Sequence, residues 1–235
     1  EVRLPAMVTE DAFYLSHTVE PVDIPSQEDV DHFLPPRERS ATIQVGSAMR
    51  LGSFTGPDLY MEFRHKIASA MSRARDVFLE IEDDYARITG RNHGGLLPMY
   101  RVDDADTVLV TMGTATTTAR GVVDAMREDG HKVGLAKLRT FRPFPVQELR
   151  DLAQGVDRIG VLDRSFTFGA AGAAFTEVAA SLYSLPERPV LRDFVAGLGG
   201  RDITATTVRE AFLDLLTRDG PESAWVELKS RTGGE

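Results

Sequence analysis

The sequence predicts an α/β fold in which a mostly parallel sheet carries helices on both faces. Three observations predict it. Strand-like and helix-like segments alternate through the second half of the 235-residue chain. The strand-like segments at 106–112 and 133–138 are apolar runs, which are typical of strands buried on both faces. A turn rich in Gly and Thr leads from the first run straight into a helical pattern, as in a βαβ unit.

The first βαβ unit begins with the run Asp106 to Met112, which predicts a buried strand. A Gly/Thr turn over residues 113–118 follows, and Ala119 to Met126 predicts a helix. A strand from Val133 to Leu138 completes the unit, which we expect to be right-handed with parallel strands. The remaining predicted elements are helices over 146–153, 169–185 and 206–216 and strands over 158–163 and 189–195.

The first part of the chain lacks this alternation. Arg3 to Thr9 predicts a strand, which is followed by a turn and an extended stretch. Ser26 predicts the N-cap of a short helix, with Asp29 in the capping-box position, and Pro35-Pro36 predicts the end of that helix. Residues 37–57 carry Gly, Ser, Thr and Pro and predict an irregular connector.

The longest periodic segment runs from Asp58 to Ile88, where apolar residues recur every three or four positions. Gly90 predicts its end. A helix of about thirty residues is long for a compact domain, where helices average about 11 residues. We interpret it as a bridge between two domains or as a surface against a partner. A helix that covers the core of its own domain is the alternative.

Composition excludes several classes of protein. The hydrophobic content of 42% and charged content of 27% are ordinary for a globular protein. A net charge of −9 argues against a nucleic-acid partner, and no apolar run approaches the ~20 residues of a membrane span. Without cysteine, the chain itself holds no disulfide, thiolate-ligated zinc or iron–sulfur cluster. The five histidines are scattered, so we expect no metal site. No signal peptide is visible, and we expect a cytoplasmic protein.

A proline-stiffened turn follows the strand that ends at Leu138. Pro143 and Pro145 flank Phe144, and both fix the backbone, which favours extended geometry at Arg142. We expect Arg142 to face a partner or the neighbouring domain and Phe144 to be buried beneath the carboxyl edge of the sheet. Phe144→Ala should then cost roughly 3 kcal/mol or more, and Arg142→Ala less than about 0.5 kcal/mol. A plain strand-to-helix turn, with Phe144 in the core, is the alternative.

Two further loops carry candidate binding residues. Gly113, Thr114 and Thr116 lie at a predicted helix N-terminus, where backbone N–H groups and hydroxyls can hold an anion. The segment has neither a GxGxxG nor a Walker pattern, so close packing at Gly113 with a threonine cap is the other interpretation. Residues 197–204 form a glycine-rich loop that contains Arg201 and ends at Thr204, a predicted cap of the last helix. No Ser/His/Asp, Cys/His or paired-carboxylate arrangement is present, so we predict no catalytic residue.

Five motifs in register resemble one family. They resemble the C-terminal part of the alpha subunit of pyruvate:ferredoxin oxidoreductase, within the 2-oxoacid:ferredoxin oxidoreductase family. The resemblance covers nearly the whole chain. In order, the motifs are Phe13-Tyr-Leu-Ser-His-Thr-Val-Glu-Pro-Val, Asp31-His-Phe-Leu-Pro-Pro, Leu138-Arg-Thr-Phe-Arg-Pro-Phe-Pro, Asp163-Arg-Ser and Gly197-Leu-Gly-Gly-Arg-Asp-Ile-Thr.

The resemblance implies an activity and its cofactors. Members use thiamine diphosphate to decarboxylate a 2-oxo acid oxidatively, pass electrons through iron–sulfur clusters to ferredoxin, and form an acyl-CoA. Thiamine diphosphate, Mg²⁺ and the clusters would be held by other domains or by subunits of the beta, gamma and delta type, so none is expected on this chain alone. We expect the isolated chain to be inactive, with Arg142, Phe144 and Arg201 at interfaces. The resemblance leaves open which 2-oxo acid is used.

The resemblance also implies a domain organisation. Residues 1–24 would be the C-terminal edge of the thiamine diphosphate (pyrimidine) domain, and residues 25–95 a connector with the long helix. Residues 96–218 would be the transketolase C-terminal-like domain, and residues 219–235 a tail. Because residue 1 is Glu and precedes a predicted strand, we interpret the start as a cut edge. We then expect apolar residues there to be exposed or to pair with a second copy; these are Val2, Leu4, Met7, Val8, Phe13 and Leu15.

Two functions remain open at this point. The chain is either a structural and interface portion of such an oxidoreductase, or a module that by itself binds CoA or a nucleotide phosphate at residues 113–118. Titration of the isolated chain with CoA and with thiamine diphosphate separates the two hypotheses.

Overall fold

The computed structural model describes residues 1–34, 36, 42–48, 52, 54–218 and 223–229. The chain forms two compact units. The helical unit contains Glu1–Val8 and Val19–His93, and the α/β unit contains Thr9–Thr18 and Gly94–Glu235. Among the described residues, no helix is both long enough and apolar enough to span a membrane.

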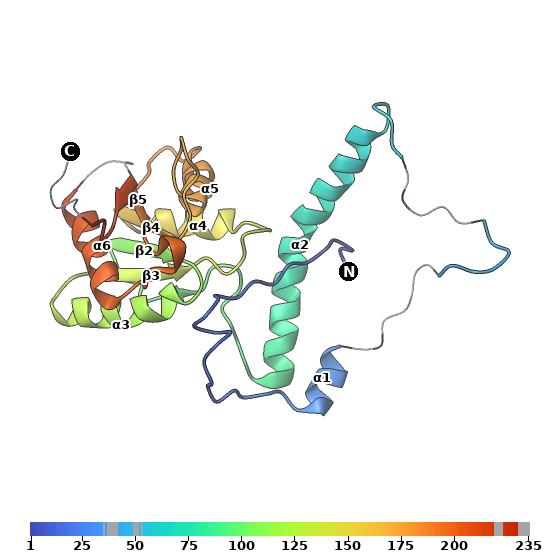
Figure 1. Ribbon diagram of the computed structural model, residues 1–235, viewed down its shortest axis with the longest axis horizontal. Coiled ribbons are helices and arrows are strands. Elements are labelled where there is room, and N and C mark those ends of the chain that lie inside the picture. Colours follow the sequence, from blue (N-terminus) through green and yellow to red (C-terminus); the bar gives the residue numbers. More distant parts are fainter. Residues whose placement is uncertain (35, 37–41, 49–51, 53, 219–222, 230–235) are drawn as a thin grey trace. The chain divides into compact units, whose positions relative to one another are not determined.

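The α/β unit is built on one six-stranded sheet, shown in Figure 1. Its strands lie in the order β1-β3-β2-β4-β5-β6. All neighbouring strands run parallel except β1, which is antiparallel to β3. The predicted fold class is therefore confirmed. The strands are β1 (Met99–Tyr100), β2 (Thr107–Thr111), β3 (Val133–Lys137), β4 (Arg158–Asp163), β5 (Val190–Val195) and β6 (Ser223–Trp225).

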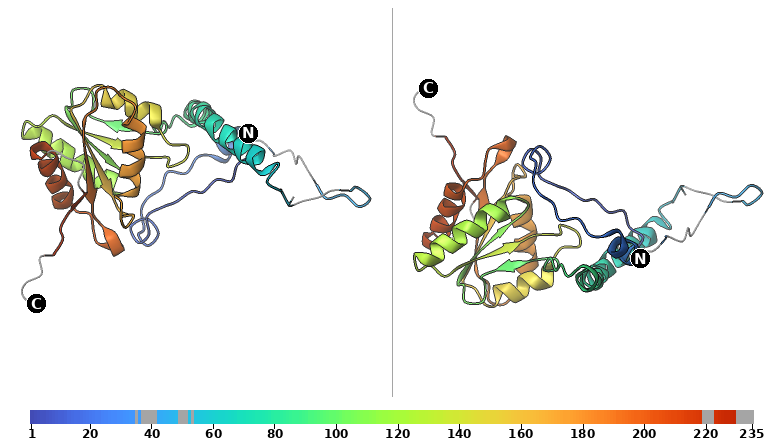
Figure 2. Two further views of the ribbon diagram at one scale, coloured as in Figure 1. Left: turned by 90° about the horizontal axis from the view of Figure 1, so that it is seen from above. Right: turned by 90° about the horizontal axis from the view of Figure 1, so that it is seen from below.

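Helices cover both faces of the sheet (Figure 2). The helices α3 (Ala115–Glu128) and α6 (Ala205–Thr217) lie on one face, and α4 (Val146–Ala153) and α5 (Ala173–Leu182) lie on the other. Two buried apolar clusters result, because alternate residues of each strand point to opposite faces. The cluster under α3 and α6 includes Leu109, Phe194 and Phe212. The cluster under α4 and α5 includes Val108, Ile159 and Leu182.

The order of the strands reverses between β2 and β4. The connection through α3 places β3 on one side of β2, whereas the connection through α4 returns to the other side and places β4 there. The helices that follow β2 and β4 therefore leave the sheet on opposite faces. Such a reversal separates the loops at the carboxyl ends of the two strands, where open α/β sheets bind their ligands.

Most predicted elements of this unit are confirmed, with two corrections. The helix α3 begins at Ala115 rather than Ala119, because only Gly113 and Thr114 form the turn. The helix α5 begins at Ala173 rather than at residue 169. Gly169 has a φ of +88°, and Thr167 N–H bonds to the Ala171 carbonyl oxygen, so a closed turn precedes the helix. The strands β1 and β6 were not predicted, since two or three residues are too short to show a period.

The predicted strand over Arg3–Thr9 is wrong. The segment is irregular, and Arg3 has a φ of +55°, outside the extended region that a strand needs. The expected exposure of nearby apolar side chains is confirmed for Met7 and Val8 in the helical unit and for Phe13 and Leu15 in the α/β unit. Val2 and Leu4 are half-buried.

Both helices of the helical unit are confirmed. The helix α1 (Gln27–Phe33) begins after Ser26, whose hydroxyl accepts a hydrogen bond from the Asp29 N–H group. The helix α2 (Tyr60–Thr89) ends at Gly90 in the left-handed conformation. Pro35 and most of residues 37–53 lie outside the described residues. Within α2, only Ala70 and Glu82 are buried. The predicted role of α2 as a connector between domains stays a prediction.

Candidate functional site

The β2–α3 turn holds an anion that belongs to the chain itself. Gly113 has a φ of +65°, and the backbone N–H of Thr114 donates a hydrogen bond of 2.6 Å to Oδ2 of Asp11. The hydroxyl of Thr114 donates to the same oxygen. A Cβ atom at position 113 would lie 2.6 Å from that oxygen, so Gly113 provides both the turn conformation and the space.

The second oxygen of the Asp11 carboxylate faces the end of β4. Arg164 follows this strand directly, and its guanidinium lies 3.4 Å from Oδ1 of Asp11. Partial burial alone would raise the pKa of Asp11, but the hydrogen bonds from Thr114 and the charge of Arg164 outweigh it and lower the pKa. The carboxylate therefore bridges the carboxyl ends of β2 and β4, at the reversal point of the sheet.

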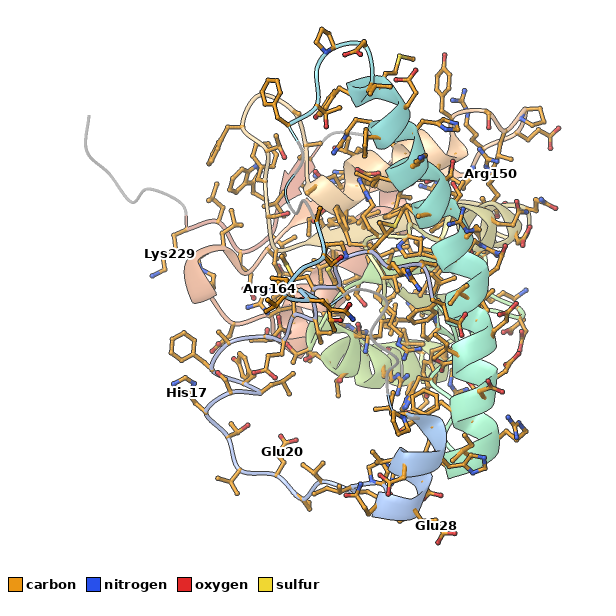
Figure 3. The ribbon with its side chains drawn as sticks, turned by 90° about the vertical axis from the view of Figure 1, so that its right-hand side faces the viewer. His17, Glu20, Glu28, Arg150, Arg164 and Lys229 are labelled. Atoms are coloured by element: carbon orange, nitrogen blue, oxygen red, sulfur yellow. The ribbon has the colours of Figure 1, made fainter. Side chains whose placement is uncertain are left out.

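A third contact joins the stretch Thr9–Thr18, which contains Asp11 and Tyr14, to the loop after β5. The hydroxyl of Tyr14 hydrogen-bonds to Oδ1 of Asp202, and this bond raises the pKa of Tyr14. Figure 3 labels Arg164, in the loop after β4, and His17, three residues after Tyr14. A cavity of about 80 Å³ remains, lined by Tyr14, Thr114, Ala115, Thr118, Arg164 and Ile203. It is far smaller than the roughly 300–1,000 Å³ of typical small-molecule sites.

The predicted anion-binding residues do not all face this site. Gly113 and Thr114 contact the Asp11 carboxylate, whereas the hydroxyl of Thr116 lies 2.9 Å from that of Thr111 in the buried interior. Sequence reasoning missed Asp11 and Arg164 as members of the site. Arg164 could have been found from its position directly after a predicted strand. Asp11 carries no local signal, because it is 103 residues from Thr114.

A second polar cluster lies at the N-terminus of α5. Asp163 of β4 accepts hydrogen bonds from the backbone N–H groups of Ala174, at 3.2 Å, and Phe175, at 2.9 Å. Asp193 of β5 accepts from Gly172 N–H at 2.8 Å and from the Ser223 hydroxyl at 2.6 Å, both through Oδ2. Its Oδ1 atom is buried and has no hydrogen-bond partner among the described residues. The N-terminus of α5 is thus held by two buried carboxylates.

The pKa of Asp163 is raised above its ordinary value of 3.8. Burial is the largest cause, and the charge of Asp193 adds to it, while the N–H groups of Phe175 and Ala174 oppose it. Folding therefore favours protonated Asp163. Its contribution to stability is complete below the ordinary pKa and is lost as the pH rises through the raised pKa.

Replacing Asp163 with asparagine should remove this loss. We expect the free energy of unfolding of the variant to change less with pH than that of the unchanged chain, because asparagine does not ionise. The measurement is denaturant unfolding at several pH values from about 4 to 8. Asp103→Asn, at an exposed carboxylate, is the control and should keep the original profile. Parallel profiles for Asp163→Asn and the unchanged chain would contradict the prediction.

The proline-stiffened turn packs against α5. Arg142 forms a 2.6 Å ion pair with Glu177 and lies over the ring of Phe141, with 4.7 Å between its guanidinium carbon and the ring centroid. The residue that pairs with Arg142 is therefore in the same unit. Contact of Arg142 with another chain or domain stays a proposal. The predicted full burial of Phe144 is wrong, because the ring is only partly buried against the cluster under α4 and α5.

The stability prediction for this turn changes accordingly. We expect Phe144→Ala to cost less than the roughly 3 kcal/mol of a fully buried ring. Arg142→Ala should cost about 0.2–1 kcal/mol, because its ion pair is exposed to solvent. Denaturant unfolding of the two variants measures both values. A larger loss for Arg142→Ala than for Phe144→Ala would contradict this order.

The glycine-rich loop after β5 also makes contacts within the unit. Arg201, a predicted interface residue, donates a 2.6 Å hydrogen bond to the Glu227 carbonyl oxygen. Thr204 caps α6 as predicted, in a capping box with Thr207. These bonds fix the loop that carries Asp202 and its contact with Tyr14.

The described residues do not fit thiamine diphosphate and its metal ion. They contain no group of three or more His, Asp or Glu side chains placed to hold a metal. At the reversal point, the N–H and hydroxyl of Thr114 already bind Asp11, and the cavity of about 80 Å³ is too small for the cofactor. We therefore assign no step of cofactor chemistry to these residues.

Two protein-family models match the chain in sequence order. The model described as "Pyruvate flavodoxin/ferredoxin oxidoreductase, thiamine diP-bdg" matches residues 1–83. The model described as "Pyruvate:ferredoxin oxidoreductase core domain II" matches residues 105–208, the body of the α/β unit. Together they match residues of both units and leave residues 84–104 and 209–235 unmatched.

Curated relatives match the same stretch. The pyruvate synthase subunit PorA of Methanothermobacter thermautotrophicus is 42% identical over 99% of this chain and 59% of that protein. The ketoisovalerate oxidoreductase subunit VorA of Pyrococcus horikoshii is 41% identical over 91% of this chain and 55% of that protein. The chain thus spans little more than half the length of these relatives.

Solved structures are less similar. The alignment with a 2-oxoglutarate:ferredoxin oxidoreductase from Magnetococcus marinus covers 69% of this chain and 24% of the oxidoreductase chain, at 12% identity and a TM-score of 0.43. A split-gene transketolase aligns with 49% of this chain and 39% of that chain, at 18% identity and a TM-score of 0.41. The assignment therefore rests on the sequence matches. By those matches, the chain belongs to the 2-oxoacid:ferredoxin oxidoreductase family and is similar to part of its PorA and VorA subunits.

Proposed function

We propose that the chain is part of the alpha subunit of a thiamine diphosphate-dependent 2-oxoacid:ferredoxin oxidoreductase. The complete enzyme decarboxylates the 2-oxo acid, transfers the acyl group to CoA and passes the electrons to ferredoxin. The alignment with PorA over 99% of the chain carries this proposal. We favour pyruvate as the substrate, because PorA, which matches 99% of this chain, is a pyruvate synthase subunit. Ketoisovalerate is the alternative substrate, because VorA is a ketoisovalerate oxidoreductase subunit.

Within that enzyme, this portion serves domain packing and subunit contact. The buried clusters of the α/β unit and the internally satisfied turn at Gly113 support a structural role. Thiamine diphosphate, Mg²⁺ and the iron–sulfur clusters are proposed to reside on other domains or on the beta, gamma and delta type subunits. The absence of cysteine from the given sequence supports this for the clusters.

The test is purification of the assembled complex through a tag on this chain. We expect CoA-dependent oxidation of a 2-oxo acid with reduction of ferredoxin, and a higher kcat/KM for pyruvate than for ketoisovalerate. A purified complex that oxidises neither acid in the presence of thiamine diphosphate, Mg²⁺ and CoA would overturn the proposal. A preference for ketoisovalerate would overturn only the substrate assignment.

The alternative, a module that binds CoA or a nucleotide phosphate at residues 113–118, is not favoured. The N–H and hydroxyl of Thr114 are already bonded to Asp11, so a phosphate would have to displace that carboxylate. Titration of the chain with CoA should therefore give no saturable binding.

A further inference from the structure

The family match assigns the segment Thr9–Thr18 to one part of the chain, whereas its contacts in the structure assign it to another. The thiamine-binding family model spans residues 1–83 and so includes it. Its own contacts place it with the α/β unit, whereas the flanking stretches Glu1–Val8 and Val19–His93 belong to the helical unit. A short stretch of one family domain is therefore docked on the unit that contains the other.

The docking contacts are polar and come from three strand ends. Asp11 binds Thr114 after β2 and Arg164 after β4, and Tyr14 binds Asp202 after β5. These loops lie at the carboxyl edge of the sheet, around its reversal point. The Asp11 carboxylate occupies the place at which the first turn of α3 offers an N–H group and a positive helix dipole.

The segment is also folded upon itself. The backbone N–H of His17 bonds to the Phe13 carbonyl oxygen at 3.1 Å, and the N–H of Phe13 bonds to the Ser16 hydroxyl at 2.9 Å. The rings of Phe13 and His17 lie 5.1 Å apart. A turn that is already ordered loses less conformational entropy when it binds.

Apolar burial does not hold the segment in place. Phe13 is 69% exposed and Leu15 is 50% exposed, so neither ring nor aliphatic chain contributes much hydrophobic free energy to docking. Hydrogen bonds to an ionised group are stronger than those between neutral groups. Asp11 accepts two hydrogen bonds from Thr114 and pairs with Arg164, whereas Asp202 accepts one hydrogen bond from Tyr14, so the attachment depends mainly on Asp11.

We propose that Thr9–Thr18 is a releasable strap, an internal ligand of the reversal point that is fastened by Asp11 and couples the thiamine-binding part of the alpha subunit to the α/β unit. The reversal point is thus a docking surface for an acidic turn of this chain and not for a free cofactor. The coupling role rests on the proposed function, whereas the strap itself does not.

Hydrogen exchange of the full chain tests the strap. In Asp11→Asn, the amide groups of residues 12–18 should exchange about tenfold faster or more, which corresponds to the loss of one charge-assisted hydrogen bond. The neighbouring Glu10→Gln is the matched control and should leave exchange unchanged. Equal exchange in Asp11→Asn and the unchanged chain would overturn the strap.

A second variant tests the geometry. Arg164→Gln removes the longer, 3.4 Å contact, which is partly exposed, so exchange should rise less than in Asp11→Asn. An equal or larger rise would assign the attachment to Arg164 and overturn the role of Asp11 as the main anchor.

Turnover of the assembled complex tests the coupling. Asp11→Asn should lower kcat severalfold, while KM for the 2-oxo acid stays unchanged, because the variant does not touch the substrate. Faster exchange together with normal turnover would keep the strap and overturn its coupling role. If the complex that contains the unchanged chain has no activity, the proposed function fails instead.

Discussion

Replacing Phe194 with alanine should lower the free energy of unfolding of the α/β unit by about 3–5 kcal/mol. The ring is fully buried in β5, within the cluster under α3 and α6. It packs over Gly160 of β4, where an added Cβ would lie 2.9 Å from the ring. Because β5 is held between two strands, the space left by the ring has little room to collapse. Denaturant unfolding with a fitted slope measures the loss.

Phe168→Ala is the matched control for this substitution. Phe168 lies in the loop after β4, and its side chain is 88% exposed. We expect a change within about 0.5 kcal/mol. A loss below about 1 kcal/mol for Phe194→Ala would show that the cluster repacks and would contradict the close packing described at Gly160.

Gly172→Ala should cost about 3 kcal/mol, the upper part of the usual range for overpacking. Gly172 has a φ of −57°, which any residue adopts, so the cost is entirely steric. The added Cβ would lie 2.7 Å from Oδ1 of Asp193 and would also meet Oδ2 of Asp163. Both carboxylates are buried and cannot turn outward without losing the N–H groups of α5. Thermal or denaturant unfolding provides the measurement.

Gly121→Ala is the control for that glycine. Residue 121 is exposed in α3, and no atom lies within 4 Å of an added Cβ. Alanine should therefore stabilise the unit, by up to about 1 kcal/mol, since glycine is the weaker helix former. An equally small effect at both glycines would mean that the carboxylates at the start of α5 move apart easily.

The body of the sheet could be predicted because its signals are local. Apolar runs mark strands that are buried on both faces, and β2 and the middle of β4 are such runs. The false strand at Arg3–Thr9 has the same local pattern, but among the described residues it has no neighbouring strand to pair with. Strand formation depends on such a neighbour, and a single sequence does not reveal one.

The candidate site could be predicted only in part. Gly113 and Thr114 stood out because a glycine followed by threonines marks a helix start that can hold an anion. The anion itself was not predictable, since Asp11 comes from a segment 103 residues away. The closeness of the Asp163 and Asp193 carboxylates could not be predicted either, because it depends on the register of β4 against β5.

The single carboxylate of Asp193 fastens segments that the chain keeps far apart. Through Oδ2 it holds Gly172, just before α5, and Ser223, the first residue of β6 at the edge of the sheet. Neither segment can detach without leaving a buried charge short of a donor, and such a loss is costly. We therefore expect the start of α5 and β6 to open as one cooperative unit, with matching opening free energies in hydrogen exchange. An edge strand of three residues would in this way acquire the local stability of a helix that covers the sheet.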